Sequence, residues 1–155
     1  MLILRQVRVP VIFRDGIPHI WPMSDRMKLW GDTLKQLEQD EEGLDQIYPD
    51  MAKFYFPMEI TTGDVFKLDQ IYVLQVRSDD EARFEELSGP NGFMTLRSEI
   101  YRPEYLRGMP DNEQEYFKRL IEITRNTKVV TIIRPQEIKV RELMLQIIEQ
   151  LAQGR

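Results

Sequence analysis

Apolar and polar residues alternate at the start of the chain in the manner of a β-hairpin. Over residues 2–13 apolar side chains recur at nearly every second position with arginines between them, which is typical of a strand. Arg14-Asp15-Gly16 predicts a tight turn, because Asp and Gly tolerate the positive φ angles that a hairpin turn needs. Ile17 to Trp21 is the expected returning strand.

The next segment shows helical spacing. Ser24 and Asp25 are favourable helix N-caps, and they precede apolar residues spaced three or four apart: Met27, Trp30, Leu34 and Leu37. This spacing predicts a helix that ends in the acidic stretch 38–43, which we interpret as a solvated helix end. Residues 44–68 are punctuated by prolines and a glycine, so we expect irregular structure anchored by the aromatic residues 54–56.

The second half of the chain alternates predicted strands and helices. A run of β-branched and aromatic residues predicts a strand, whereas an apolar face at helical spacing predicts a helix. The expected elements, in order, are a buried strand over 71–76, a short strand over 83–87, a turn over 88–92 into a helix that Pro103 ends, a helix from Pro110 to Asn126, a strand over 129–133, and a last helix whose first turn holds Pro135 and which runs to Leu151. The prediction is a single domain over 1–155 of mixed α/β class, with a mixed sheet and flanking helices.

Composition narrows the function classes. The 155 residues carry a formal charge of −5, no cysteine and one histidine, and 42% are hydrophobic. A nucleic-acid-binding protein usually shows a basic excess, so we expect no nucleic acid as a partner. The lack of cysteine excludes disulfides and thiolate metal sites. No window approaches the roughly 20 apolar residues that cross a bilayer, and no secretory signal is recognisable, so we expect a cytoplasmic protein with no membrane partner.

Several catalytic motifs are absent from the chain. It contains no GxxxxGK[ST] phosphate-binding loop, no GxGxxG and no GxSxG. His19 is the sole histidine, and a structural role is the favoured interpretation because a histidine triad or a multi-histidine metal site needs more partners. The acidic pair Asp79-Asp80 is a weak candidate for magnesium, since adjacent residues of an extended segment point to opposite faces. We therefore predict no metal site.

Three segments taken together resemble a known family. They are Asp15-Gly16-Ile17-Pro18 with Arg26-Met27-Lys28-Leu29-Trp30 and Asp32; Ile71-Tyr72-Val73-Leu74 followed by Leu87-Ser88-Gly89; and Ile100-Tyr101-Arg102-Pro103-Glu104-Tyr105-Leu106 followed by Arg134-Pro135. In this order and spacing they resemble the C-terminal half of the HPr-kinase-like proteins, a group in the phosphoenolpyruvate-carboxykinase-like branch of the P-loop proteins. The resemblance covers about residues 10 to 150.

The resemblance implies an activity whose machinery this chain lacks. Members of the family are ATP-dependent serine kinases, and their N-terminal half carries the P-loop and a paired-aspartate segment. The position that corresponds to the acidic pair reads Leu4-Arg5-Gln6-Val7 here. Phosphoryl transfer depends on positioning and on neutralising phosphate charge with backbone amides, lysine and magnesium. We therefore expect no kinase activity and no cofactor for this chain alone; ATP and Mg would be required only if another segment or chain supplied the missing half.

Four basic residues are the candidates for binding phosphate or another anion. Arg26 and Lys28 match the family's basic pair, Arg102 lies in the Tyr-Arg-Pro motif, and Arg134 precedes Pro135. For each of them a structural role, as an exposed helix flank or an internal ion pair, is the alternative. Trp21 and Trp30 are expected in the core rather than on a stacking surface.

Three functional hypotheses follow. The favoured one is a non-catalytic binding or regulatory module of HPr-kinase type, or a half that needs a partner chain. The second is the functional part of an ATP-dependent serine kinase whose P-loop lies elsewhere, and the third is an unrelated small α/β interaction protein. A family half without its N-terminal strands exposes a sheet edge or an apolar face. We thus expect a homo-oligomer, or a partner protein that covers the N-terminal strand, residues 2–13.

Overall fold

The computed structural model describes residues 9–60, 63–78, 81–99 and 110–153. None of the helices in these segments is long and apolar enough to cross a membrane. The elements, in chain order, are β1 (Val11–Arg14), β2 (Ile17–Ile20), β3 (Arg26–Trp30), α1 (Gly31–Gln36), β4 (Gln46–Tyr48), β5 (Met51–Pro57), β6 (Phe66–Lys67), β7 (Gln70–Arg77), β8 (Arg83–Glu86), α2 (Gly89–Ser98), α4 (Pro110–Asn126), β9 (Lys128–Pro135) and α5 (Val140–Gln153).

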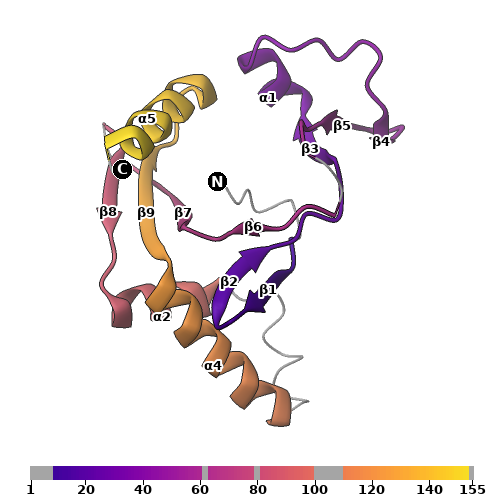
Figure 1. Ribbon diagram of the computed structural model, residues 1–155. Coiled ribbons are helices and arrows are strands. Elements are labelled where there is room, and N and C mark those ends of the chain that lie inside the picture. Colours follow the sequence, from indigo (N-terminus) through magenta and orange to yellow (C-terminus); the bar gives the residue numbers. More distant parts are fainter. Residues whose placement is uncertain (1–8, 61–62, 79–80, 100–109, 154–155) are drawn as a thin grey trace.

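The strands form three small sheets, which confirms a mixed α/β architecture. Their orders are β1-β2-β6, β3-β5-β4 and β7-β9-β8. In Figure 1 the β7-β9-β8 sheet lies on the left with α5 above it, and the β3-β5-β4 sheet lies on the right. The β1-β2 hairpin lies between them, beside α4. The predicted mixed sheet is β7-β9-β8; the other two sheets are antiparallel.

The predicted opening hairpin is confirmed. Val11 pairs with Ile20 and Arg14 with Ile17, and the two turn residues Asp15 and Gly16 have φ angles of 51° and 75°. Two consecutive positive φ angles are the signature of the turn that matches the twist of paired strands, which is why Asp-Gly suits this position. The expected first strand began at residue 2; residues 1–8 lie outside the described part of the chain, where β1 begins at Val11.

The β7-β9-β8 sheet contains a buried core, and its strands are those that the sequence predicts. β7 and β9 run parallel, with Ile71 beside Val129, and β8 pairs antiparallel with β9. Helix α5 covers one face, where Tyr72, Ile132, Leu143 and Ile147 form a buried cluster. Residues 129 and 131–133 of β9 are all buried, as expected for a strand covered on both faces. The strands predicted over 71–76, 83–87 and 129–133 are therefore confirmed.

Three predictions in the first half and at the end of β9 are wrong. The residues after Ser24-Asp25 form strand β3, and the helix begins only at Gly31. Residues 44–68 contain β4, β5 and β6 instead of irregular structure, with β5 in the centre of a sheet. Pro135 is the last residue of β9, so it precedes the last helix instead of occupying its first turn.

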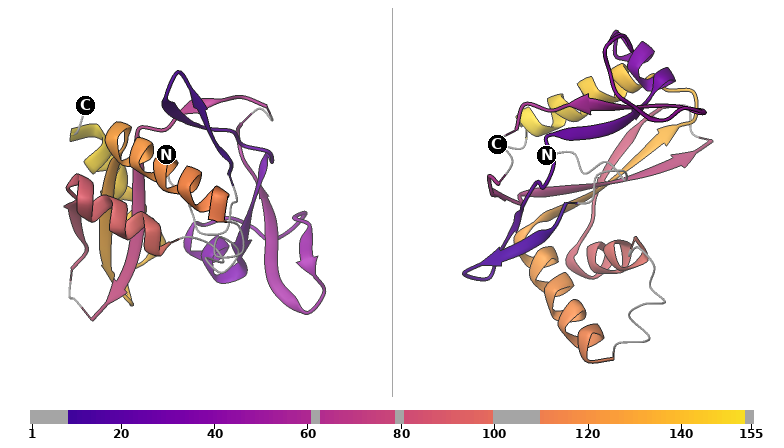
Figure 2. Two further views of the ribbon diagram at one scale, coloured as in Figure 1. Left: turned by 90° about the horizontal axis from the view of Figure 1, so that it is seen from below. Right: turned by 90° about the vertical axis from the view of Figure 1, so that its right-hand side faces the viewer.

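Helices α2 and α4 occur where the sequence predicts them. α2 begins at Gly89 directly after Ser88, so the expected turn over 88–92 is already helical; Ile100 and Pro103 lie outside the described residues. α4 ends at Asn126, whose side-chain amide donates to the carbonyl of Glu122. The two helices pack together through Phe93 and Phe117, whose ring centroids are 4.9 Å apart. The two views of Figure 2 show α4 running past the hairpin with α2 at its side.

Candidate functional site

The side chains of strand β3 alternate between an exposed and a buried face of the sheet. Arg26, Lys28 and Trp30 are exposed, whereas the intervening Met27 is half-buried and Leu29 is buried. Since successive side chains of a strand point to opposite faces, the first three share one face of the β3-β5-β4 sheet. The other face packs on α1 through Leu29, Leu34 and Phe54. The sheet thus has an apolar inner face and a charged, aromatic outer face.

The pairing of β5 with β3 completes the outer face. Trp30 lies opposite Lys53, and Lys28 lies opposite Tyr55. The amine of Lys53 is 4.8 Å from the ring centroid of Trp30, and the amine of Lys28 is 5.5 Å from that of Tyr55. The guanidinium of Arg26 is 4.8 Å from the same Tyr55 ring. We call these five residues, Arg26, Lys28, Trp30, Lys53 and Tyr55, the basic–aromatic face.

The charges of the basic–aromatic face are only partly neutralised. Arg26 forms an ion pair with Asp45, with 3.2 Å between Nη1 and Oδ2, and both side chains are exposed. In the part of the chain that the structure describes, Lys28 and Lys53 make no ion pair with a carboxylate. A cation over an aromatic ring gains on the order of 0.5–1 kcal/mol at an exposed site, which positions the amines without neutralising them. The face therefore presents net positive charge to solvent.

This arrangement suits the binding of an anion. Ammonium and guanidinium groups donate charge-assisted hydrogen bonds to phosphate or carboxylate oxygens, and the planar guanidinium can donate two in parallel. The adjacent rings of Trp30 and Tyr55 offer apolar surface to whatever carries the anion. Among the described residues no group of histidine and carboxylate side chains is arranged to hold a metal ion.

The structure brings together two of the four predicted anion-binding residues. Arg26 and Lys28 share the Tyr55 ring, as described above. Arg134 lies on β9 in another sheet, where its Nη1 donates to the carbonyl oxygen of Pro135 at 3.1 Å, a contact that fits the structural alternative. Arg102 lies outside the described residues.

Sequence reasoning missed Lys53, Trp30 and Tyr55, and it misplaced the tryptophans. Trp30 is 44% exposed, and Trp21 is exposed as well, so neither belongs to the core. A usable signal was present, because Arg26, Lys28 and Trp30 occur at every second position, the period of a strand. The helical interpretation of this segment hid that period.

A polar hollow of about 550 Å³ lies where α2 begins and α4 ends. Its lining includes Arg125 and Lys128 but also Asp69 and Glu86, together with Ser88 and Gly89 at the start of α2. The partly positive start of α2 and the partly negative end of α4 both line this hollow, so the effects of the two helix dipoles on a bound anion offset each other. Because its lining holds as many carboxylates as cations among these four residues, the hollow offers less net positive charge to a triphosphate than the basic–aromatic face offers to a single anion.

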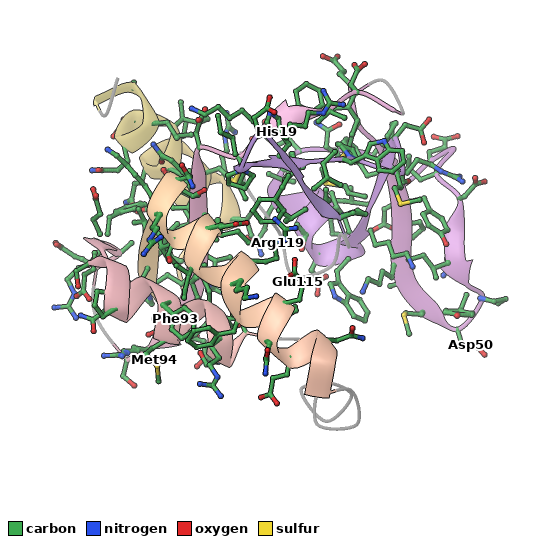
Figure 3. All side chains as sticks on the ribbon, turned by 60° about the horizontal axis from the view of Figure 1, so that its bottom comes forward. His19, Asp50, Phe93, Met94, Glu115 and Arg119 are labelled. Atoms are coloured by element: carbon green, nitrogen blue, oxygen red, sulfur yellow. The ribbon has the colours of Figure 1, made fainter. Side chains whose placement is uncertain are left out.

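Arg119 links helix α4 to the β1-β2 hairpin. Its guanidinium lies 4.5 Å from the ring centroid of Phe13 and forms ion pairs of 2.8 Å with Glu115 and Glu122. The hydrogen bond that Arg119 donates to the carboxylate of Glu122, ahead of the negative charge of Glu115, raises the pKa of Arg119. Figure 3 shows Glu115 and Arg119 on α4 beneath the hairpin that carries His19. His19 is half-buried, and its Nδ1 is 2.9 Å from the carbonyl oxygen of Ile17, in keeping with a structural role.

Comparison with known proteins identifies no relative of this chain. No protein-family model, no curated protein and no solved structure matches it.

Proposed function

We propose that this chain is a non-catalytic binding module that holds a compact phosphate-bearing ligand on its basic–aromatic face. The observation that carries the proposal is the convergence of three cations from two neighbouring strands, Arg26, Lys28 and Lys53, on an outward face where two of them lack a described acidic partner. Trp30 and the half-buried Tyr55 hold these cations at the surface, where a ligand can meet charge and a flat apolar ring together.

The spacing of the cations suits a ligand with one or two phosphate groups. Alternate residues on a strand are roughly 7 Å apart and neighbouring strands roughly 5 Å apart, so a diphosphate can reach two neighbouring cations at once, whereas Arg26 and Lys53 lie roughly 14 Å apart along the strands. An extended polyanion would reach beyond these cations and meet a chain whose formal charge is −5. This supports a phosphorylated side chain or a small phosphate ester as ligand, and neither a nucleic acid nor a membrane as partner.

The family resemblance supports a regulatory setting for this binding. In the HPr-kinase-like proteins that the sequence resembles, Arg26 and Lys28 correspond to a basic pair, and the chain has no GxxxxGK[ST] segment with which to catalyse transfer. We propose a cytoplasmic module of this type that binds a phosphate group but does not itself catalyse phosphoryl transfer.

The second candidate is one part of an ATP-dependent serine kinase, with the P-loop supplied by another segment and with ATP and Mg as cofactors. The hollow at the start of α2 favours this candidate, because its volume accommodates a nucleotide and two of its lining residues, Arg125 and Lys128, are cationic. The carboxylates of Asp69 and Glu86 in the same lining count against it. The two candidates place phosphate on different elements, so the same variants separate them.

The experiment is calorimetric titration of the full chain with a phosphoserine peptide, its unphosphorylated counterpart, pyrophosphate and ATP with and without Mg. We expect the phosphorylated probes to bind and the unphosphorylated peptide not to bind. The double variant Lys28→Gln/Lys53→Gln should weaken binding about tenfold or more, since each charge-assisted contact contributes on the order of 1 kcal/mol.

A matched control keeps the test specific. Lys118→Gln/Lys139→Gln removes the same charge from exposed positions on α4 and before α5, and it should change affinity less than about twofold. Binding of Mg-ATP that survives Lys28→Gln/Lys53→Gln and is lost in Lys128→Gln would favour the kinase candidate instead. If no phosphorylated probe binds, the proposal is wrong and an interaction protein unrelated to phosphate is the better description.

A further inference from the structure

Strand β3 has an unpaired edge that borders the basic–aromatic face. In the sheet order β3-β5-β4 it is an outer strand, and no strand of the described segments pairs with its other side. An outer strand offers backbone N–H and C=O groups to which an extended chain can add. A chain that added to β3 would lie directly beside Arg26, Lys28 and Trp30.

The pairing of β3 with β5 determines which backbone groups point to the open edge. One step before the register begins at Arg26, the carbonyl of Asp25 accepts a hydrogen bond of 2.6 Å from the amide of Met58. In an antiparallel pair, residues bonded to the neighbouring strand alternate with residues whose groups face away. Pro57, opposite Arg26, has no N–H and agrees with this alternation. The even-numbered residues of β3 therefore turn their backbone groups toward the open edge.

Only part of this edge is already satisfied. The hydroxyl oxygen of Ser24 accepts from the N–H of Arg26 and donates to its C=O, at 3.1 Å in each case. In the described part of the chain, no comparable contact is made to the N–H and C=O of Lys28 or to the N–H of Trp30. A strand that adds to β3 therefore finds its first open partner at Lys28.

Charge determines what kind of strand fits this edge. Arg26 and Lys28 are exposed, and charged side chains on an edge strand usually prevent other strands from adding to it. A second copy of β3 would bring the same cations and be repelled, so the homo-oligomer expected from the sequence would not form here; residues 2–13 stay its predicted contact. A strand that carries a phosphate beside Lys28 turns the repulsion into charge-assisted hydrogen bonds.

We propose that β3 binds an extended phosphopeptide, which adds antiparallel as a fourth strand in the order peptide-β3-β5-β4. This inference rests on the proposed function and specifies its ligand as a phosphorylated side chain within an extended segment. Antiparallel pairing lets one peptide residue donate to the C=O of Lys28 and accept from its N–H. We assign this place to the phosphorylated residue, because directly opposite side chains share a face and Lys28 lies on the basic–aromatic face.

The register also assigns the neighbouring positions of the peptide. The phosphate lies beside Lys28, and Arg26, whose guanidinium shares the Tyr55 ring with the Lys28 amine, is the second cation within its reach. The peptide residue two positions before the phosphate lies opposite Trp30, which is 44% exposed and favours an apolar side chain there. The two residues next to the phosphorylated one point to the inner face, where the half-buried Met27 offers apolar contact.

The test is calorimetric titration of the full chain with two phosphorylated probes. One is a capped heptapeptide with phosphoserine at its centre and a valine on each side of it. The other is a single phosphoserine capped at both ends, which carries the same phosphate but cannot extend along β3. We expect the heptapeptide to bind at least tenfold more tightly, because each further backbone hydrogen bond contributes about fivefold.

Methylation of the peptide backbone tests the strand pairing without altering the protein. A methyl group on the phosphoserine nitrogen removes the N–H that donates to Lys28 and should weaken binding about tenfold or more. A methyl group on the nitrogen of the next valine, whose N–H points away from β3, is the matched control and should change affinity less than about twofold.

Hydrogen exchange of the protein's amides locates the added strand. The heptapeptide should slow exchange at Lys28, which gains a backbone partner, while the capped single phosphoserine should not. The amide of Arg26 is already bonded to Ser24 and should change little with either probe.

The outcomes separate this inference from the proposed function. If both phosphorylated probes bind equally and neither methyl group matters, phosphate binding stands and strand addition is wrong. If neither phosphorylated probe binds, the proposed function fails and this inference fails with it. Equal binding of the unphosphorylated heptapeptide, or a tightly bound phosphopeptide that leaves exchange at Lys28 unchanged, would also overturn the inference.

Discussion

The β7-β9-β8 and β3-β5-β4 sheets are built alike but bury different amounts of their surface. Each has three strands and one helix on its inner face, with a core of Tyr72, Ile132, Leu143 and Ile147 in the first and of Leu29, Leu34 and Phe54 in the second. Central strand β9 is buried on both faces, whereas β5 buries one face and presents Lys53 and Tyr55 on the other. The first sheet is thus suited to hold the fold and the second to display a surface.

The largest expected effect comes from the core of the first sheet. Ile132 is fully buried between α5 and the neighbouring strands, and Ile132→Ala should lower the free energy of unfolding by about 4 kcal/mol through lost burial and the cavity left behind. Urea denaturation followed by circular dichroism measures the loss. Ile148→Ala, at an exposed position of α5, should cost less than about 0.5 kcal/mol. Equal losses from the two variants would contradict the assignment of this core.

A smaller and more local effect is expected in the second sheet. Leu34 is fully buried beneath β3 and β5, so Leu34→Ala should cost about 3 kcal/mol locally. We expect hydrogen exchange to accelerate across β3, α1 and β5 while the amides of β7 and β9 keep their protection, because few contacts join the two sheets. Uniform acceleration over the whole chain would show that the two sheets unfold as one unit and that the comparison above is wrong.

The same contrast explains how much of the fold the sequence predicts. Tyr72 and Val73 are buried, as are Val129 and residues 131–133, so these segments are nearly continuous apolar runs rich in β-branched residues, a pattern typical of buried strands. In the second sheet the apolar residues Met27 and Leu29 belong to a strand, and Leu34 and Leu37 to the region of α1. Trp30, which is exposed, completes an accidental helical spacing between them. A short strand followed directly by a short helix, as β3 is followed by α1, can therefore imitate a single longer helix when the hydrophobic spacing is judged over both elements together.

The candidate site follows the same rule. Arg26 and Lys28 are recognisable from the sequence because they lie close together in it. Lys53 and Tyr55 join them only through the antiparallel register of β3 with β5, which depends on contacts between residues more than twenty positions apart. No local pattern in the chain specifies that register. The unpaired edge of β3 is hidden for a similar reason, since strand order is a property of the folded chain.

The smallest expected effect is the contribution of the Tyr72 hydroxyl, on edge strand β7 of the first sheet, to the free energy of unfolding as a function of pH. Burial raises the pKa of Tyr72 above its usual value of 10.0, and its hydroxyl donates to Oε1 of Gln70 at 2.6 Å. The folded chain therefore retains the phenol proton at a pH where the unfolded chain loses it. This contribution to stability is complete below pH 10 and is lost as the pH rises toward the higher pKa of the folded state.

Tyr72→Phe should cost about 1 kcal/mol at pH 7, from the lost hydrogen bond. Its disadvantage relative to wild type should shrink above pH 10, because phenylalanine has no proton to lose. Urea denaturation at pH 7 and at two pH values above 10 measures both terms, and Tyr48→Phe, at an exposed position, controls for loss of a hydroxyl at pH 7. A disadvantage that stays constant or grows with pH would mean that Tyr72 is solvated. In that case β7 would not be buried beneath α5, and the role of the first sheet as the scaffold of the fold would be wrong.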